Sequence, residues 1–166
     1  MTKVKYCPQC GANLVQTPIE GINRRACPDE SCDYVFWNNP VPVVAAIVEY
    51  NGEIILGRNK DWPEKWYSIN TGFLEKGETP EQGAAREVKE ELGLDAEQVN
   101  FVGIYSFFEM NQLIIAYHVL ARGKIQLGDE IVATKSIPPQ KIRTWPQATG
   151  QALRDWLISR GYMENL

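Results

Sequence analysis

Three glutamates in one short stretch have the residue type and the spacing for metal-assisted chemistry. Glu87, Glu90 and Glu91 are spaced i, i+3 and i+4, so on a helix their Cβ atoms lie roughly 5–6 Å apart on one face. Like charges at this spacing destabilise an isolated helix, and a hard divalent cation with oxygen ligands would offset that cost. Two such cations can clamp the attacking and leaving oxygens of an in-line phosphoryl displacement. The spacing therefore indicates a site suited to a diphosphate.

A solvated helix face is the alternative explanation, because Arg86 and Lys89 are near enough to screen the glutamates. The surrounding residues favour the metal site. The pattern reads Gly72, five residues, Glu78, seven residues, Arg86-Glu87, apolar Val88, Lys89, Glu90-Glu91, Leu92, Gly93 and apolar Leu94. This pattern resembles the complete Nudix box.

The resemblance implies a fold, a reaction and a metal. The fold would be α/β, with a mixed sheet between helices, and the reaction would be hydrolysis of a nucleoside diphosphate linked to another moiety. Glu87, Glu90 and Glu91 would bind Mg²⁺ or Mn²⁺, and one of them would activate water.

Four further residues are assigned to this site by the same resemblance. Glu78 and Arg86 would form the pair that orients the carboxylates. The backbone carbonyl of Gly72 would be an additional metal ligand. Glu130 occupies the place where the family often adds a ligand from a downstream loop, and an exposed loop glutamate is the alternative there.

All four cysteines fall near the start of the chain and match a tetrahedral Zn²⁺ site. Cys7 and Cys10 form one pair, and Cys27 and Cys32 form a second pair with a wider spacing. Four protein ligands would make the zinc structural and not catalytic. Two disulfides or unpaired thiols are the alternatives, and a reducing compartment argues against disulfides. We therefore expect a zinc ribbon over residues 1–37 and a Nudix hydrolase domain over residues 38–166.

The helix that must carry the glutamates has clear ends. Thr79 is a good N-cap, Pro80 suits the first helical position, and Gln82 completes a capping-box pattern. Gly93 is placed to end the helix in the left-handed conformation.

Short apolar runs predict the sheet beneath that helix. Asn51-Gly52 separates two of these runs and is typical of a tight hairpin turn. We expect strands at 43–48, 53–56, 66–71, 101–108 and 113–121, a loop at 72–77, a helix at 148–160, and a linker at 38–42. Residues 128–142 do not favour one element. Tyr105, Phe107, Phe108 and Tyr117 are expected in the core, with base stacking as the alternative, and His118 is expected to be a core histidine.

Composition excludes several classes of protein. The hydrophobic share of 44% and the charged share of 23% are ordinary for a globular domain. The start lacks an apolar stretch long enough for a signal peptide, and no stretch is long enough to span a membrane, so we expect a cytoplasmic protein without membrane contact. A net charge of −4 does not favour nucleic acid as a partner.

A zinc ribbon before a Nudix box resembles the NADH pyrophosphatase branch of the family. That branch carries a Ser-Gln-Pro-Trp-Pro-Phe-Pro-type stretch after the box, whereas residues 105–112 here read YSFFEMNQ. We therefore expect a dinucleotide substrate such as NADH, ADP-ribose or FAD, and the resemblance implies a homodimer. The alternatives are a nucleotide-sugar, nucleoside triphosphate or RNA-cap pyrophosphatase, or a non-catalytic nucleotide sensor or nucleic-acid-binding module.

Overall fold

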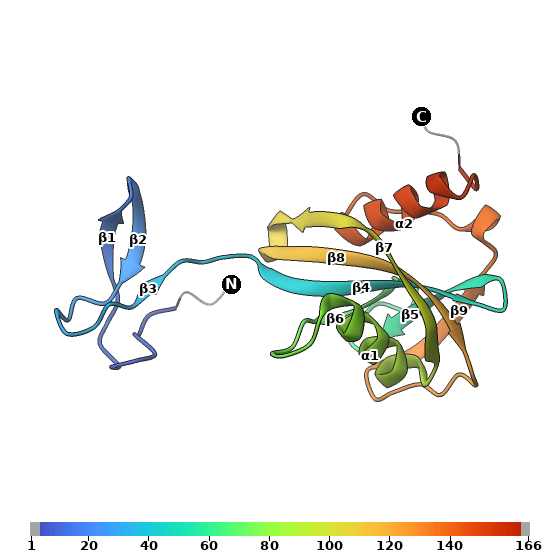
Figure 1. Cartoon of the computed structure of the whole chain (residues 1–166), viewed down its shortest axis with the longest axis horizontal. Helices are drawn as coiled ribbons and strands as arrows, with labels where there is room; N and C mark the ends of the chain where they lie inside the picture. The colour runs from blue at the N-terminus through green and yellow to red at the C-terminus, as the bar shows by residue number, and fades with distance from the viewer. Residues whose placement is uncertain (1–3, 164–166) are drawn as a thin grey trace. The chain divides into compact units, whose positions relative to one another are not determined.

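The computed structural model describes residues 4–163, and the chain divides into two compact units between Asn39 and Pro40. The first unit contains a three-stranded antiparallel sheet in the order β1-β2-β3 (Figure 1). Its strands are β1 (Val15–Ile19), β2 (Ile22–Ala26) and β3 (Val35–Phe36).

The second unit is a mixed six-stranded sheet with a helix on each face (Figure 1). The strand order is β7-β8-β4-β5-β9, and β6 pairs with the first half of β4. β4 and β8 are parallel, and the other pairs are antiparallel. The elements are β4 (Val41–Tyr50), β5 (Glu53–Asn59), β6 (Asn70–Phe73), α1 (Pro80–Leu92), β7 (Asp95–Phe107), η1 (Phe108–Met110), β8 (Gln112–Arg122), β9 (Ile131–Ile137), η2 (Pro139–Lys141) and α2 (Ala148–Ser159).

The central strand β4 separates two hydrophobic clusters. Val43, Ala45 and Ile47 pack in the cluster that includes α2, whereas Val44 and Ala46 pack in the cluster that includes α1. A strand covered on both faces reads as a continuous apolar run, because neither set of alternate side chains meets water. The α/β mixed sheet between helices that the sequence predicted is confirmed.

The ends of α1 match the sequence prediction. The Thr79 side chain accepts a hydrogen bond from the backbone of Gln82, and the Gln82 side chain accepts one from the backbone of Thr79. Gly93 ends the helix with a φ of 71°. The hairpin turn is also confirmed, because Asn51 and Gly52 both have positive φ between β4 and β5. The face that α1 presents to the sheet is thus fixed at both ends of the helix.

Two strands begin at other residues than the sequence predicted, and one segment for which the sequence favoured no element has defined elements. β6 begins at Asn70, and Gly72 belongs to it because it pairs with Val44 of β4, so the expected strand at 66–71 and loop at 72–77 were misplaced. β7 begins at Asp95, earlier than expected, because its first residues pair with the end of β8. The ambiguous segment 128–142 contains β9 and η2.

No helix within residues 4–163 is both long enough and apolar enough to cross a membrane.

Candidate functional site

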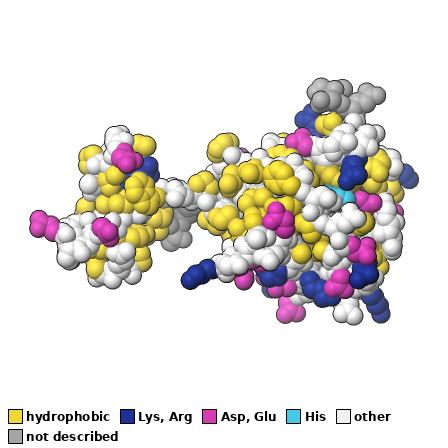
Figure 2. Space-filling view, viewed as in Figure 1, with side chains coloured by type: hydrophobic (Ala, Val, Ile, Leu, Met, Phe, Trp, Pro, Cys, Tyr) yellow, Lys and Arg dark blue, Asp and Glu magenta, His cyan; other side chains and the backbone are white. Residues whose placement is uncertain are grey.

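A cleft of about 570 Å³ lies in the second unit, and it contains every residue of the predicted metal site except Glu78. Its walls come from β6, α1, the starts of β4 and β8, and the loop at residues 128–130. Figure 2 shows charged side chains gathered on the part of the second unit that carries α1, and hydrophobic side chains gathered over the ends of β7 and β8. The residues that line the cleft include the acidic side chains of Glu87, Glu90, Glu91 and Glu130, which we call the acidic wall, and the apolar side chains of Val43 and Phe73, which we call the apolar wall.

Arg86 is the hub of the acidic wall. Its Nε and Nη2 donate to the two carboxylate oxygens of Glu78 at 3.0 and 2.8 Å. Its Nη1 donates to Glu87 at 2.7 Å and to Glu90 at 2.9 Å. The bidentate bond holds the pKa of Glu78 at about 2, so this carboxylate is ionised at neutral pH. Arg86 thus links three carboxylates from α1 and the preceding loop.

Glu87 lies directly against the backbone of β6 at Gly72. A Cβ atom built on Gly72 would lie 1.8 Å from the Glu87 carboxyl carbon. Any larger residue at position 72 would therefore displace that carboxylate. Burial raises the pKa of Glu87, and the bond from Arg86 opposes this shift.

Glu91 is held by a residue that the sequence reasoning did not single out. The Nδ2 of Asn70 in β6 donates to its Oε2 at 2.6 Å. Burial and the nearby charge of Glu87 raise the pKa of Glu91 to about 7, although the bond from Asn70 opposes both effects. A carboxylate with this pKa can accept and release a proton near neutral pH.

The loop that carries Glu130 is attached to the end of α1. The backbone N–H of Gly128 donates to the Glu91 carbonyl at 3.0 Å, and that of Gln126 donates to the Leu92 carbonyl at 2.8 Å. A Cβ on Gly128 would lie 2.3 Å from the Glu90 carbonyl oxygen, so the loop approaches the helix closely. Glu130 lines the cleft, and its charge contributes to raising the pKa of Glu91.

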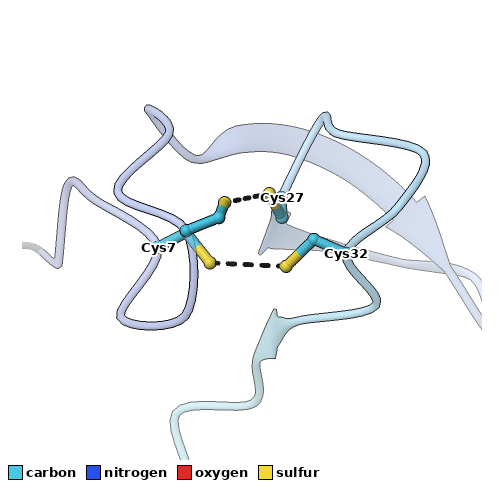
Figure 3. A group of neighbouring side chains, drawn as sticks. Cys7, Cys27 and Cys32 are labelled. Atoms are coloured by element: carbon cyan, nitrogen blue, oxygen red, sulfur yellow. Dashed lines mark hydrogen bonds between the residues drawn. The ribbon is translucent and has the colours of Figure 1, made fainter.

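The four cysteines form a second candidate site, in the first unit. Their sulfurs all lie within 4.8 Å of one another, with Cys7–Cys32 at 3.6 Å and Cys10–Cys27 at 3.4 Å. Figure 3 shows the sulfurs of Cys7, Cys27 and Cys32 pointing toward one another. These separations are well beyond a disulfide bond of roughly 2.05 Å, and all four cysteines are free. The cluster offers four ligand atoms to a single metal ion.

Turns at both cysteine pairs hold the sulfurs together. Gly11 has a φ of 78°, and its N–H donates to the Cys7 carbonyl at 2.9 Å. The N–H of Cys32 donates to the Asp29 carbonyl at 2.9 Å, which closes the wider second loop. The four-residue gap between Cys27 and Cys32 therefore still brings both thiols to the cluster.

Residues 39–157 match the protein family described as NUDIX domain, and the match includes the cleft residues, α1 and most of α2. The chain belongs to the NUDIX family. A crystal structure of a NUDIX hydrolase from Nitrosomonas europaea superposes with a TM-score of 0.81 at 24% identity, covering 96% of this chain and 93% of that chain. At this identity the likeness shows a shared fold.

Two curated relatives carry names that state an activity. The NAD-capped RNA hydrolase NudC of Vibrio atlanticus is 30% identical over 118 residues, which cover 69% of this chain and 41% of that protein. The mitochondrial NAD(P)H pyrophosphatase NUDT13 of Mus musculus is 29% identical over 119 residues, which cover 71% of this chain and 33% of that protein. The chain spans less than half the length of these relatives.

The acidic wall of this NUDIX domain fits the divalent metal that enzymes of the family use. Glu87, Glu90, Glu91 and Glu130 supply hard oxygen atoms, which suit Mg²⁺ or Mn²⁺ better than zinc. The Oδ1 of Asn70 is a buried acceptor with no hydrogen-bond donor within the described residues. Two of the carboxylates have raised pKa values, as expected of buried anions whose charge a cation would neutralise.

The other residues named from the sequence lie outside the cleft. His118 is 5% exposed, bonds to Glu49 at 2.8 Å and stacks on Trp156, so it is a core histidine. Tyr117 is buried and donates to Glu81. Tyr105 and Phe107 pack against the α2-side core, whereas Phe108 is 86% exposed, so the expectation that Phe108 is a core residue was wrong.

Sequence reasoning also missed residues that line the cleft, among them Phe73 and Gln112. Phe73 lies on the apolar wall with 60% of its surface exposed, and Gln112 lies at the start of β8. An aromatic residue directly after the box glycine was a signal for Phe73. No comparable signal marks Gln112, because its place in the cleft depends on the pairing of β8 with β4.

Proposed function

We propose that this chain is a metal-dependent pyrophosphohydrolase that cuts the diphosphate bridge of a nucleoside diphosphate linked to another moiety. The substrate class that we favour is a dinucleotide such as NADH, ADP-ribose or FAD. The observation that carries the proposal is the acidic wall, on which Glu87, Glu90 and Glu91 face one cleft and are tied to Arg86 and Asn70. A solvated helix face would not half-bury the carboxylates of Glu87 and Glu91 in this way.

Glu87, Glu90 and Glu91 would hold Mg²⁺ or Mn²⁺, with the Gly72 carbonyl and Glu130 as additional ligands. The ion would supply neutralisation of the diphosphate charge and would lower the pKa of water in the site. Arg86 and Glu78 hold the carboxylates in place through the bonds described above. Glu91, with a pKa of about 7, is our choice for the group that takes the proton from the attacking water.

The apolar wall suits the ring of a base. Phe73 presents an exposed aromatic ring beside the carboxylates, and its β4 partner Val43 is a buried apolar neighbour in the same wall. Stacking on an aromatic side chain accepts any base, because every base has a π-face. The Gln112 amide, which can donate and accept hydrogen bonds, lies in the same cleft.

The first unit would be a zinc ribbon that supports folding. We assign the ribbon to residues 1–37 and the hydrolase domain to residues 38–166, with Zn²⁺ held by Cys7, Cys10, Cys27 and Cys32. We also propose a homodimer in the cytoplasm. Light scattering on the purified full chain tests the oligomeric state, and a monomer at micromolar concentration would contradict the dimer.

A panel of substrates tests the proposed function. NADH, NAD, ADP-ribose, FAD, nucleotide sugars and nucleoside triphosphates are each offered with Mg²⁺ or Mn²⁺, and products are detected by phosphate release through a coupled phosphatase. One strong, metal-dependent activity on a dinucleotide supports the proposal. Absence of hydrolysis by folded, zinc-loaded protein with every substrate would overturn it.

An RNA carrying a dinucleotide cap is the second candidate substrate. The name of the Vibrio relative favours it, because that protein is called an NAD-capped RNA hydrolase. The diphosphate chemistry would be unchanged, and only the leaving group would differ. Comparing a capped oligoribonucleotide with free NAD in the same assay separates the two substrates.

A further inference from the structure

Two cations on the sheet have no anionic partner among residues 4–163. Arg58 lies near the end of β5, and Lys135 lies in β9. Within residues 4–163, neither side chain forms an ion pair or a hydrogen bond, and the Nε of Arg58 is buried. A buried donor without an acceptor costs free energy, and the cost is larger for a charged group. The pair therefore lacks a counterion within the described part of the chain.

The strand register places Arg58 and Lys135 on the same face. Arg58 is opposite Ala133, and Leu56 is opposite Lys135, so the two cations are diagonal neighbours across β5 and β9. The Nζ of Lys135 lies 3.9 Å from the ring centroid of Tyr67. Gly57 bridges to Ser68, which places Tyr67 beside Arg58. The three side chains thus form one group, which we call the Arg58–Lys135 cluster.

This cluster lies close to the candidate active site. Lys60 follows Arg58 by two residues, and its N–H donates to the Glu130 carbonyl at 2.9 Å. Two residues of extended chain span at most roughly 7 Å, so the Arg58 backbone lies on the order of 10 Å from a residue that lines the cleft. Arg58 follows Leu56 by two residues, so its side chain is on the α2 side of the sheet, as are those of Tyr67 in the cluster and Val43 in the apolar wall of the cleft. The cluster therefore shares one side of the sheet with the wall that we assign to the base.

We propose that the Arg58–Lys135 cluster binds a phosphate group of the substrate that lies outside the scissile diphosphate. An arginine guanidinium matches phosphate with paired donors, and a lysine adds a point charge, so the two together suit a phosphate monoester or diester. The inference rests on the proposed function, because it concerns the substrate of the same cleft. Such a phosphate has two sources: the 2′-phosphate of a phosphorylated dinucleotide, or the 3′-phosphodiester of an RNA chain.

Product nucleotides test the cluster without requiring catalysis. Isothermal titration calorimetry on the zinc-loaded full chain compares AMP, adenosine 2′,5′-bisphosphate and adenosine 3′,5′-bisphosphate. We expect one bisphosphate to bind at least ~10-fold more tightly than AMP, because a charged hydrogen bond contributes about that factor. Preference for the 2′ isomer identifies a phosphorylated dinucleotide, and preference for the 3′ isomer identifies an RNA chain.

Variants test whether the preference for a bisphosphate over AMP depends on the cluster. Arg58→Gln and Lys135→Gln should each reduce the bisphosphate preference toward the affinity for AMP. Arg154→Gln and Lys124→Gln, at exposed positions elsewhere, should keep it. Lys135 is itself exposed, so its variant tests the cluster even if Arg58→Gln fails to fold.

Two results would overturn the inference: equal affinity of the wild-type chain for all three nucleotides, or a preference that survives both cluster variants. Failure of the proposed function is a separate result. The wild-type chain could hydrolyse no substrate in the panel and still show a bisphosphate preference that depends on the cluster. That result would contradict the proposed function and support the phosphate-binding site.

Discussion

The amide of Asn70 and the carboxylate of Glu91 are joined by a hydrogen bond of 2.6 Å that ties β6 to the last turn of α1. Asn70 is itself buried, so its side chain has little freedom to turn away. The bond fixes one oxygen of a carboxylate that lines the cleft. Asn70 is therefore a positioning residue for the carboxylate that we assign to proton transfer.

Replacing Glu91 with glutamine tests that assignment. Glu91→Gln keeps an oxygen that can accept the Asn70 bond but removes the group that takes a proton, so turnover should fall by at least ~10²-fold with the fold retained. Circular dichroism and thermal melting check the fold, and steady-state kinetics check turnover. Near-normal turnover of the purified variant would contradict the role of Glu91.

The raised pKa of Glu91 predicts how stability depends on pH without added divalent cation. Between its ordinary pKa of 4.5 and its folded-state value of about 7, the folded protein retains a proton that the unfolded chain has lost. The free energy of unfolding should therefore fall as pH rises through this window. Urea midpoints at pH 4.5, 6 and 7.5 measure the trend, and Glu91→Gln should flatten it. An identical slope in the variant would rule out Glu91 as its source.

Arg86→Lys should weaken metal use while preserving charge. A lysine is a single point charge and cannot bond Glu78, Glu87 and Glu90 together as the guanidinium does. We expect the Mg²⁺ concentration for half-maximal activity to rise roughly 10–100-fold, in line with the loss of other groups that orient metal ligands. Arg154→Lys on the exposed side of α2 is the matched control. Unchanged metal dependence in Arg86→Lys would contradict the role of Arg86 in holding the three carboxylates.

Gly72→Ala should reduce activity with little loss of stability. The added methyl would meet the far end of the Glu87 side chain, which can move, and not a rigid part of the backbone. Activity should fall roughly 10–100-fold because a carboxylate of the metal site is displaced. Gly57→Ala, whose Cβ would meet Ile131 at 3.3 Å, is a control outside the acidic wall. Wild-type kcat/KM in Gly72→Ala would show that Glu87 needs no fixed position.

Zinc removal should loosen the first unit and spare the second. The cysteine cluster joins segments that otherwise share one small sheet, so metal binding and folding should be coupled there. Limited proteolysis after chelation should cut within residues 4–37 first, with fragments identified by mass spectrometry. Cys10→Ser should give the same pattern without chelator. Protease resistance that is unchanged by both treatments would contradict a structural zinc.

Local signals in the sequence predicted α1 and the first hairpin correctly because the residues that determine them are adjacent. Thr79 and Gln82 cap the helix with each other, and Asn51-Gly52 makes a turn without help from the rest of the chain. The type and spacing of the box residues likewise placed Glu87, Glu90 and Glu91 on one face. Each of these predictions depended only on residues that are close together in the sequence.

Neighbouring residues in the sequence could not predict the start of β6 or the role of Asn70 as a site residue. Asn70 follows an apolar residue in a short segment, and only its pairing with Ala46 of β4 turns it toward Glu91. The Arg58–Lys135 cluster depends in the same way on a register between β5 and β9. Contacts between residues far apart in the chain decided each of these positions.

The parallel pairing of β4 with β8 governs when the acidic wall can assemble. Val44 pairs with Ile115, and β6 and α1 both lie in the chain between these two partners. Such non-local pairing is slow, because a long loop must close before the contacts that reward it can form. During synthesis, β8 emerges from the ribosome after the glutamates have already been made. The glutamates of α1 are therefore synthesised before the strand that completes the sheet. Chains that end before β8 should contain the whole motif but lack the binding site.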